Sequence, residues 1–377
     1  AFLVSIDARM VAPLLPAIAD SVAASIPATA FIVTAYALPY GLFQIAYGPL
    51  ADRFGKVAVV RVAVLLFGAG TLGCGLTFDL PSLIALRIVT GAFAACVFPL
   101  TLAYIGDVIP LERRQFAVGN LVTVTSIATA VSPAIGGMIA SVLTWRDLFI
   151  ACGLLTFIPA LWLYRVPSVP HVSASAAGGW RGFIAPFGAV LRSRSALTID
   201  VLVFLEGALT AGLTYLGAFL YDEYGLDYAR IGLLLGLYGI GSILMARRVG
   251  ALARRIGSGR MVLVGATLLS ASYLMLLGPH HQALFGAAML LMGIGFVTCH
   301  STLQTCITEA VPGLRGTAVA FFAFSLFLGG GAGTAALSAL LSTAGYEALL
   351  LTCGAGLAVF AIAGSLAITR VTSHRTS

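Results

Sequence analysis

Ionisable side chains inside long apolar stretches are the residues of this chain best suited to chemistry. Asp7, Arg87, Glu206 and His300 each interrupt such a stretch. A charge inside a lipid bilayer is costly and in general faces protein or water, so we expect each residue to have a partner. Burial favours the neutral form of a carboxyl group, which lets Asp7 and Glu206 bind and release protons near neutral pH. These acids therefore predict proton binding, and cationic substrates would compete for the same positions.

Each of these residues also has a purely structural interpretation. Asp7 is one option as the partner of Arg87, and such a pair would either exchange a proton or only fix helix packing. Arg9 is a weaker partner because residues 7 and 9 do not share a helical face. Glu206 is either a substrate and proton site or a hydrogen-bonded structural acid. His300 is either a proton relay or a ring that satisfies a neighbouring polar group.

A stripe of aromatic and polar side chains is predicted on one helix. Tyr36, Tyr40, Gln44 and Tyr47 follow one another at spacings of four, four and three residues, which places them on one helical face. Tyr238 continues the pattern later in the chain. Such a stripe suits flat amphipathic molecules or cations, and aromatic packing between helices is an equally good explanation.

The elements that must position these side chains are membrane helices. Hydrophobic residues make up 60% of the 377 residues and charged residues only 9%, far from the soluble average. A helix crosses the bilayer core with about 20 apolar residues. We predict twelve spans, at residues 2–19, 29–49, 57–77, 82–106, 116–141, 146–165, 196–221, 229–248, 260–278, 283–308, 316–343 and 346–368. The first span begins at Ala1 without a Met, so we expect a few residues to precede it.

The distribution of charge predicts the orientation of these spans. Most of the 21 Lys and Arg residues fall in loops on one side, and the other side is mainly acidic. Short basic loops stay cytoplasmic. We therefore expect a protein of the cell (inner) membrane with both termini in the cytoplasm. The net charge of +7 fits this signal and contact with anionic lipid head groups, and it does not indicate nucleic-acid binding.

The cysteines and the other motifs give no sign of metal or cofactor chemistry. The six cysteines lie inside predicted spans without metal-ligand spacing, and we interpret them as packing residues: Cys74, Cys96, Cys152, Cys299, Cys306 and Cys353. We expect no cofactor and no metal. An enzyme or receptor would need a nucleophile, a metal cluster or a ligand domain, and a channel would need a selectivity filter. None of these is evident.

A short basic segment occurs twice. Residues 48–56 read Gly-Pro-Leu-Ala-Asp-Arg-Phe-Gly-Lys, and residues 250–257, 202 positions later, read Gly-Ala-Leu-Ala-Arg-Arg-Ile-Gly. The same offset aligns Tyr36 with Tyr238, Gly91 with Gly293, Asp107 with Glu309, Pro110 with Pro312 and Arg113 with Arg315. We predict two homologous six-helix halves, 1–165 and 196–377. Residues 166–195 would form a cytoplasmic linker with an interfacial segment.

The first copy of this segment resembles the loop 2-3 signature of the major facilitator superfamily. The matching positions are Gly48, Asp52, Arg53, Gly55 and Lys56. The resemblance implies a latch between conformations, with the Asp at the N-terminal end of helix 11 and the basic residue against an acid of helix 4. Asp107 is the candidate for that acid. Without the resemblance, the segment is also explained as a simple orientation signal, and its two glycines would let backbones approach closely.

Other motifs extend the resemblance over nearly the whole chain. They are residues 86–91 in helix 4, residues 145–149 at the start of helix 6, and Asp7 with residues 12–19 in helix 1, which is similar to the twelve-helix drug/proton antiporter branch. In helix 5, Gly119, Ser132, Pro133, Gly136 and Gly137 keep the spacing of the antiporter signature. That signature has Gly where this chain has Ala128 and Ser132.

The resemblance implies an all-α membrane protein with the major facilitator fold, twelve helices in two pseudo-symmetric halves. It further implies a monomeric secondary transporter that exports amphipathic drugs or metabolites against protons by alternating access. The alternative is an uptake symporter with the same fold, against which the helix 5 signature argues. Substrate identity, proton or sodium coupling, and stoichiometry are open at this stage.

Overall fold

The helices of this protein follow its apolar stretches. The computed structural model describes residues 1–166, 187–279 and 281–373, which contain α-helices and short 3₁₀ turns. Ten helices of this described part are long and apolar enough to cross a membrane. Backbone groups in lipid must bond within their own segment, which a helix achieves. The prediction of an all-helical membrane protein is confirmed.

The chain folds into two compact units. Unit 1 comprises Ala1–Gly182 and Asp227–Gly232, and unit 2 comprises Phe183–Leu226 and Leu233–Ser377. The predicted linker falls largely on residues 167–186, outside the described residues, so the predicted borders of the halves stay a prediction. Residues 187–192, just after them, are helical.

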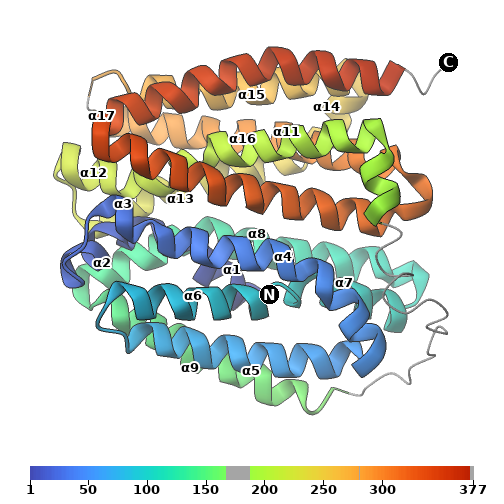
Figure 1. Cartoon of the computed structure of the whole chain (residues 1–377), viewed down its shortest axis with the longest axis horizontal. Coiled ribbons are helices and arrows are strands. Elements are labelled where there is room, and N and C mark those ends of the chain that lie inside the picture. The colour runs from blue at the N-terminus through green and yellow to red at the C-terminus, as the bar shows by residue number, and fades with distance from the viewer. Residues whose placement is uncertain (167–186, 280, 374–377) are drawn as a thin grey trace. The chain divides into compact units, whose positions relative to one another are not determined.

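Unit 1 is built from paired helices. In chain order they are α1 (Phe2–Arg9), η1 (Ala12–Leu14), α2 (Leu15–Ser21), α3 (Ile26–Thr29), α4 (Phe31–Phe54), α5 (Lys56–Gly75), α6 (Leu80–Ala94), α7 (Val97–Val108), α8 (Leu111–Val142) and α9 (Trp145–Leu163). α5 packs along α9 and α6, α4 along α6, and α1 along α8. Figure 1 shows α1 among these longer helices.

Unit 2 repeats this plan. Its helices are α11 (Arg194–Thr210), η2 (Ala211–Tyr215), α12 (Leu216–Tyr224), most of α13 (Tyr228–Ala246), α14 (Val249–Ile256), α15 (Ser258–Met275), α16 (Gln282–Ala310), η3 (Pro312–Leu314) and α17 (Arg315–Ser373). α17 reverses at Gly345, where φ is 78°, and its two parts run antiparallel (Figure 1). These parts cover the last two predicted spans, and α15 covers the span predicted at 260–278. All twelve predicted stretches are therefore helical.

The predicted basic loop after the second span is a helix instead. α4 continues through Phe54 and α5 begins at Lys56, so Gly55 alone separates them. Gly55 has a φ of 96°, which a residue with a Cβ rarely adopts, and Gly257 repeats it at 84° between α14 and α15. The apolar pattern stops where the bilayer would end, but the helix extends beyond it until a glycine with positive φ ends it.

Two helix crossings give the repeat a physical meaning. A Cβ on Gly91 of α6 would meet the backbone carbonyl of Tyr36 in α4, and a Cβ on Gly293 of α16 would meet that of Tyr238 in α13. Both pairs of aligned residues therefore mark the same close contact, once in each unit. Helices in lipid associate largely through such close packing of small residues.

Helix starts follow the same offset. The side chain of Asp79 accepts a hydrogen bond from the Ser82 amide at the start of α6, and His281 accepts one from the Ala283 amide at the start of α16. Both residues therefore satisfy a free backbone amide at the beginning of equivalent helices.

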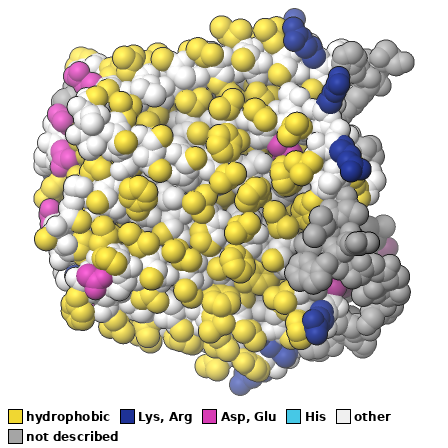
Figure 2. Space-filling view, viewed as in Figure 1, with side chains coloured by type: hydrophobic (Ala, Val, Ile, Leu, Met, Phe, Trp, Pro, Cys, Tyr) yellow, Lys and Arg dark blue, Asp and Glu magenta, His cyan; other side chains and the backbone are white. Residues whose placement is uncertain are grey.

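The surface suits a lipid environment. Hydrophobic side chains are spread widely over the face drawn in Figure 2. The Lys and Arg side chains on this face, and most of its Asp and Glu side chains, lie near the ends of the helices rather than along their middle (Figure 2). Charge is thus kept largely to the ends of the spans, although the orientation of these ends in the cell stays a prediction.

We predict that Gly91→Ala lowers the melting temperature of the detergent-purified protein. The added methyl group would press on the Tyr36 carbonyl, and such overpacking destabilises proteins by about 1–3 kcal/mol. Gly293→Ala should have a similar effect in unit 2. Gly106→Ala on α7 is the matched control, because its Cβ would meet no atom of the described residues within 4 Å. Equal melting temperatures for Gly91→Ala and Gly106→Ala would contradict the prediction.

Candidate functional site

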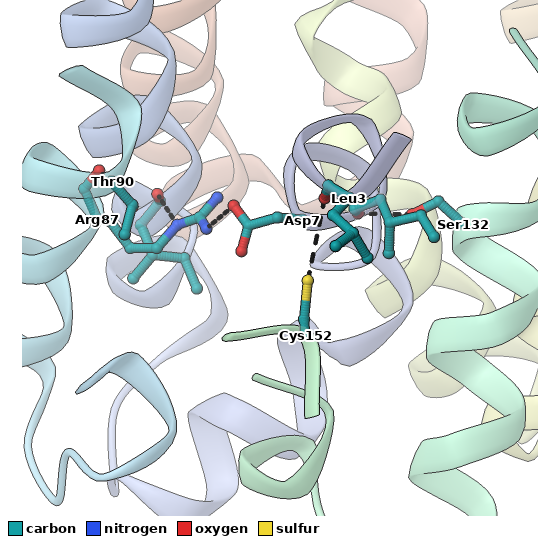
Figure 3. Close-up of polar contacts among 8 residues, drawn as sticks. Leu3, Asp7, Arg87, Thr90, Ser132 and Cys152 are labelled. Carbon is teal, nitrogen blue, oxygen red and sulfur yellow. Dashed lines mark hydrogen bonds and ion pairs between the residues drawn. The ribbon is translucent and has the colours of Figure 1, made fainter. Parts of the chain in front are cut away.

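A buried ion pair forms the centre of the candidate site in unit 1. Nη1 of Arg87 on α6 lies 2.7 Å from Oδ2 of Asp7 on α1, and the side chains are 1% and 0% exposed. Figure 3 shows the two side chains pointing toward one another. Nε of Arg87 also donates to the carbonyl oxygen of Ile32 in α4, at 3.4 Å. The structure thus joins two of the predicted residues and three helices.

Aromatic rings surround this cation. The guanidinium carbon of Arg87 lies 4.2 Å from the centre of the Tyr36 ring and 5.7 Å from that of Phe149. Both distances allow attraction between the cation and the ring face. Tyr36 stacks on Tyr40 with centroids 5.9 Å apart, and Tyr40 is hydrogen-bonded to Gln44. Three members of the predicted stripe therefore continue from the ion pair along α4.

Tyr47, the fourth member of the stripe, has a different environment. Its hydroxyl group donates to the carbonyl oxygen of Ala92 in α6 at 3.0 Å, and the side chain is buried. This bond holds α4 against α6. Tyr47 is therefore explained by packing.

The helix that carries Asp7 is fixed by contacts on its other faces. Ser132 Oγ of α8 donates to the Ile6 carbonyl at 2.7 Å, and Cys152 Sγ of α9 lies 3.9 Å from the Leu3 carbonyl (Figure 3). A Cβ on Gly136 of α8 would meet the Met10 carbonyl. Two residues of the predicted helix 5 motif, Ser132 and Gly136, thus position the helix that carries the acid.

One oxygen of the Asp7 carboxyl group has no hydrogen-bond partner. Among the described residues, Asp7 Oδ1 and the Tyr36 hydroxyl group are both buried and unpartnered. Buried polar atoms are in general hydrogen-bonded, and an unmet one suggests a proton, a water molecule or a ligand polar group. Such a proton, water molecule or ligand group would lie next to the charge of Arg87.

A second polar pair lies in unit 2. Nδ1 of His300 on α16 is 2.9 Å from Oε2 of Glu206 on α11, with the side chains 17% and 0% exposed. The imidazole ring stacks on Phe296 at 5.0 Å and 7°, and Phe322 lies 5.2 Å away. Phe296 in turn contacts Tyr238 at 6.1 Å. Unit 2 therefore gathers all its predicted coupling residues into one aromatic enclosure.

The pairing of Glu206 with His300 is not evident from the sequence. The two residues are 94 positions apart and were each predicted separately. Only their shared setting, an ionisable group inside an apolar span, pointed to either of them. Glu206 Oε1 is buried and has no hydrogen-bond partner in the described part of the chain. The pair can place a proton on either side chain.

The predicted latch residues lie at the junction of α4 and α5. Lys56 forms an ion pair with Asp107 at the end of α7, and both residues are partly exposed. Asp52 and Arg53 are exposed, and the Arg53 guanidinium lies 5.1 Å from the Phe54 ring centre. The expected contact of Asp52 with helix 11 joins the two units and stays a prediction.

The two latch glycines differ in their roles. Gly55 supplies the positive φ described above. The close backbone approach expected at Gly48 is wrong for this structure, because a Cβ there would meet no atom of the described residues within 4 Å. Gly48 lies in α4 rather than at a helix crossing, so nothing in unit 1 packs tightly on it.

The rest of the helix 5 motif lies along α8. Pro133 is inside this helix, and a Cβ on Gly137 would meet the backbone of Tyr228 and Gly232, which belong to the same unit. Ala128 is buried. Gly119 differs, since its Cβ would have no described atom within 4 Å.

Asp200 is an acid that the sequence analysis passed over. It lies on α11, is 3% exposed, and both of its carboxyl oxygens are buried without a partner among the described residues. The signal that identified Glu206, an acid inside an apolar span, applies to it equally. The described residues contain no group of three or more His, Cys, Asp or Glu side chains arranged to hold a metal.

Comparisons with known proteins give the family. The family model described as Major Facilitator Superfamily matches residues 1–334. The chain is 32% identical over 173 residues to the uncharacterised transporter Rv1250 of Mycobacterium tuberculosis, covering 45% of this chain but only 30% of that protein. It is 25% identical to the multidrug resistance protein Stp of the same species, over 90% of this chain and 74% of that protein.

The fold has solved counterparts. The crystal structure of a D-xylose-proton symporter superposes with a TM-score of 0.79 at 14% identity, over 97% of this chain and 94% of that one. At this identity the likeness concerns the fold alone. Together with the family match over nearly nine tenths of the chain, it leads to one conclusion. The chain is a multi-pass membrane transporter that belongs to the major facilitator superfamily.

Proposed function

We propose that this transporter exports amphipathic small molecules in exchange for protons. The observation that carries the proposal is the burial of one acid beside one basic side chain in each unit, Asp7 with Arg87 and Glu206 with His300. An acid in such a place can exchange a proton only when its partner or its exposure changes. A conformational cycle supplies that change. The similarity to the multidrug resistance protein Stp supports export of drugs.

The chemistry of the two pairs would couple proton and substrate. A proton that binds Asp7 removes the negative charge that holds Arg87, so the link from Arg87 to α1 weakens. A cationic substrate near Glu206 would replace the proton as its counter-charge. The rings of Phe296 and Tyr238, which lie in the same enclosure as His300, offer apolar and π surfaces to this substrate. In unit 1, Tyr36 and Tyr40 offer similar surfaces beside Arg87.

Direction and orientation are part of the proposal. The basic ends of the helices would face the cytoplasm of the cell, with both termini there, in accord with the positive-inside rule. Protons would then enter from outside as substrate leaves, and the chain would work as a monomer. The motif of α8, whose Ser132 and Gly136 fix α1, supports export because it resembles the antiporter signature.

The first experiment distinguishes export from uptake. The purified protein is placed in liposomes that contain a pH dye, a proton gradient is imposed, and lipophilic cations, neutral drugs and sugars are added in turn. Proton movement opposite to substrate movement would support the proposal. Movement of both in the same direction would make the protein a symporter, the activity named for the D-xylose-proton symporter of the same fold.

We expect Asp7→Asn to abolish proton-coupled flux and to destabilise the protein. Removing one member of a buried ion pair leaves an unpaired charge, with a cost of about 3–5 kcal/mol. The double variant Asp7→Asn with Arg87→Gln has no unpaired charge and should regain most of the melting temperature. If the double variant also regains proton-coupled flux, the pair only fixes packing and the coupling role of Asp7 is refuted.

Glu206→Gln should stop proton movement and leave substrate exchange without a gradient largely intact. The amide can keep a hydrogen bond to His300 but cannot take up a proton. The measurement is pH-dye flux compared with exchange of labelled substrate across the same liposomes. Glu223→Gln, an exposed acid on α12, is the matched control. Unchanged proton flux in Glu206→Gln would remove this residue from the mechanism.

The latch gives a kinetic prediction. Lys56→Ala should change the rate of exchange several-fold and leave the dissociation constant for substrate nearly unchanged, because the pair with Asp107 is partly exposed whereas Arg87 and Glu206 are buried. Lys56→Arg keeps the charge and serves as control. The exchange of both charges, Lys56→Asp with Asp107→Lys, should restore the rate. A rate that stays altered in the charge exchange would argue against a latch.

A further inference from the structure

Asp200 is the buried carboxylic acid of the described residues that the proposed mechanism does not use. Neither carboxyl oxygen has a hydrogen-bond partner among the described residues, in contrast to Glu206 on the same helix, which has His300. An ionised carboxylate without any partner is strongly disfavoured away from water, whereas the neutral acid is tolerated. The surroundings of Asp200 therefore favour a bound proton in this conformation.

The helical register places Asp200 away from the Glu206 and His300 pair. Six residues of helix give a rise of about 9 Å and turn the side chain by about 120° around the axis. Asp200 lies one turn before Phe204, whose carbonyl oxygen would meet a Cβ on Gly329 of α17, and Ala208 meets Gly333 in the same way. Asp200 thus shares the face of α11 that packs on the first part of α17.

That face offers little to a charge. By the same register Ser325, which is buried, lies at the level of Asp200, and residues 321–330 of α17 include no ionisable side chain. α16, which also packs on α11, carries Cys306 and Glu309 beyond His300 in the direction of Asp200. Arg194 lies at the start of α11, six residues away. The second part of α17 also contacts α11, where a Cβ on Gly364 would meet Leu202, and carries Arg370 in its last turn. No ion pair of Asp200 with any of these groups is formed in the described structure.

A proton fits this position better than a metal cation. Sodium, magnesium or calcium ions need several oxygen ligands, and the carbonyl groups of α11 and α17 at this level are engaged within their helices. A proton needs only the carboxyl group itself. Its hydroxyl still lacks an acceptor here, so the neutral state is only partly satisfied and ready to change when the helices move.

We propose that Asp200 is a further proton-binding site, at the contact of α11 with α17, that holds a proton in this conformation and releases it when that contact opens. Proton binding at Asp200 is independent of the proposed export, and only its use in transport rests on that function. α11 would then carry two acids in different surroundings, Glu206 with His300 as its partner and Asp200 without a partner among the described residues.

The test measures protonation directly and needs no substrate. Difference infrared spectra of the purified protein are recorded in the carboxylic C=O region between acidic and alkaline pH. We expect a protonated carboxyl signal at neutral pH that is lost in Asp200→Asn and kept in Glu206→Gln. A signal unchanged in Asp200→Asn would overturn the proposal. Loss of the signal on addition of sodium at constant pH would overturn it as well, in favour of a cation site.

Two further measurements complement this test. Asp200→Glu keeps the carboxyl group and should shift the signal without removing it, which serves as the reference if Asp200→Asn does not fold. In liposomes, Asp200→Asn should release fewer protons per substrate than the wild type. Because the infrared signal is read without transport, failure of export leaves the Asp200 site supported, and failure of the site leaves export to be judged on Asp7 and Glu206.

Discussion

The exclusion of water from a helical bundle in lipid is the constraint on which this structure depends. Every ion that enters such a bundle needs an internal partner, and the ion pair of Asp7 with Arg87 shows what this requires. Arg87 joins α6 to α1 and α4, and Tyr36 and Phe149 cover its faces. α1 is held in place by contacts with Ser132 and Gly136 of α8 and Cys152 of α9. The buried charge of Arg87 therefore requires contact between α6, α1 and α4, and small side chains on α8 and α9 allow α1 to pack closely.

The same constraint explains which features repeat between the units. Gly91 with Tyr36 and Gly293 with Tyr238 are backbone contacts, and Gly55 and Gly257 are backbone conformations. Such features define the helix frame and are kept at the same offset. The buried ionisable residues are not repeated, since Glu206 aligns with Val4 and Arg87 with Met289. The two units therefore share their close helix contacts but differ in the ionisable residues buried among the helices.

Much of the frame could be predicted from the sequence, because lipid makes length and apolarity decisive. The twelve stretches are helical, and the Lys56 pair with Asp107 agrees with the resemblance. The extension of α4 through Phe54 was missed, because a helix that leaves the bilayer loses its apolar signal while keeping its hydrogen bonds. Glu206 and His300 were found singly but not as a pair, since contacts between helices depend on rotation about axes that composition does not determine.

The difference between the two buried pairs bears on how protons would drive the cycle. An Arg keeps its charge at any pH that proteins experience, so a proton on Asp7 leaves a cation unpaired inside the bundle. His300 and Glu206 can instead be neutral together, with one proton shared between them, and Asp200 has no charged partner to lose. Protonation in unit 2 therefore leaves no buried charge behind. On the proposed mechanism, unit 2 would take up protons without creating a buried charge and release them when its helix contacts open. The Asp7 pair would respond only when a rearrangement of α1 gives Arg87 another partner.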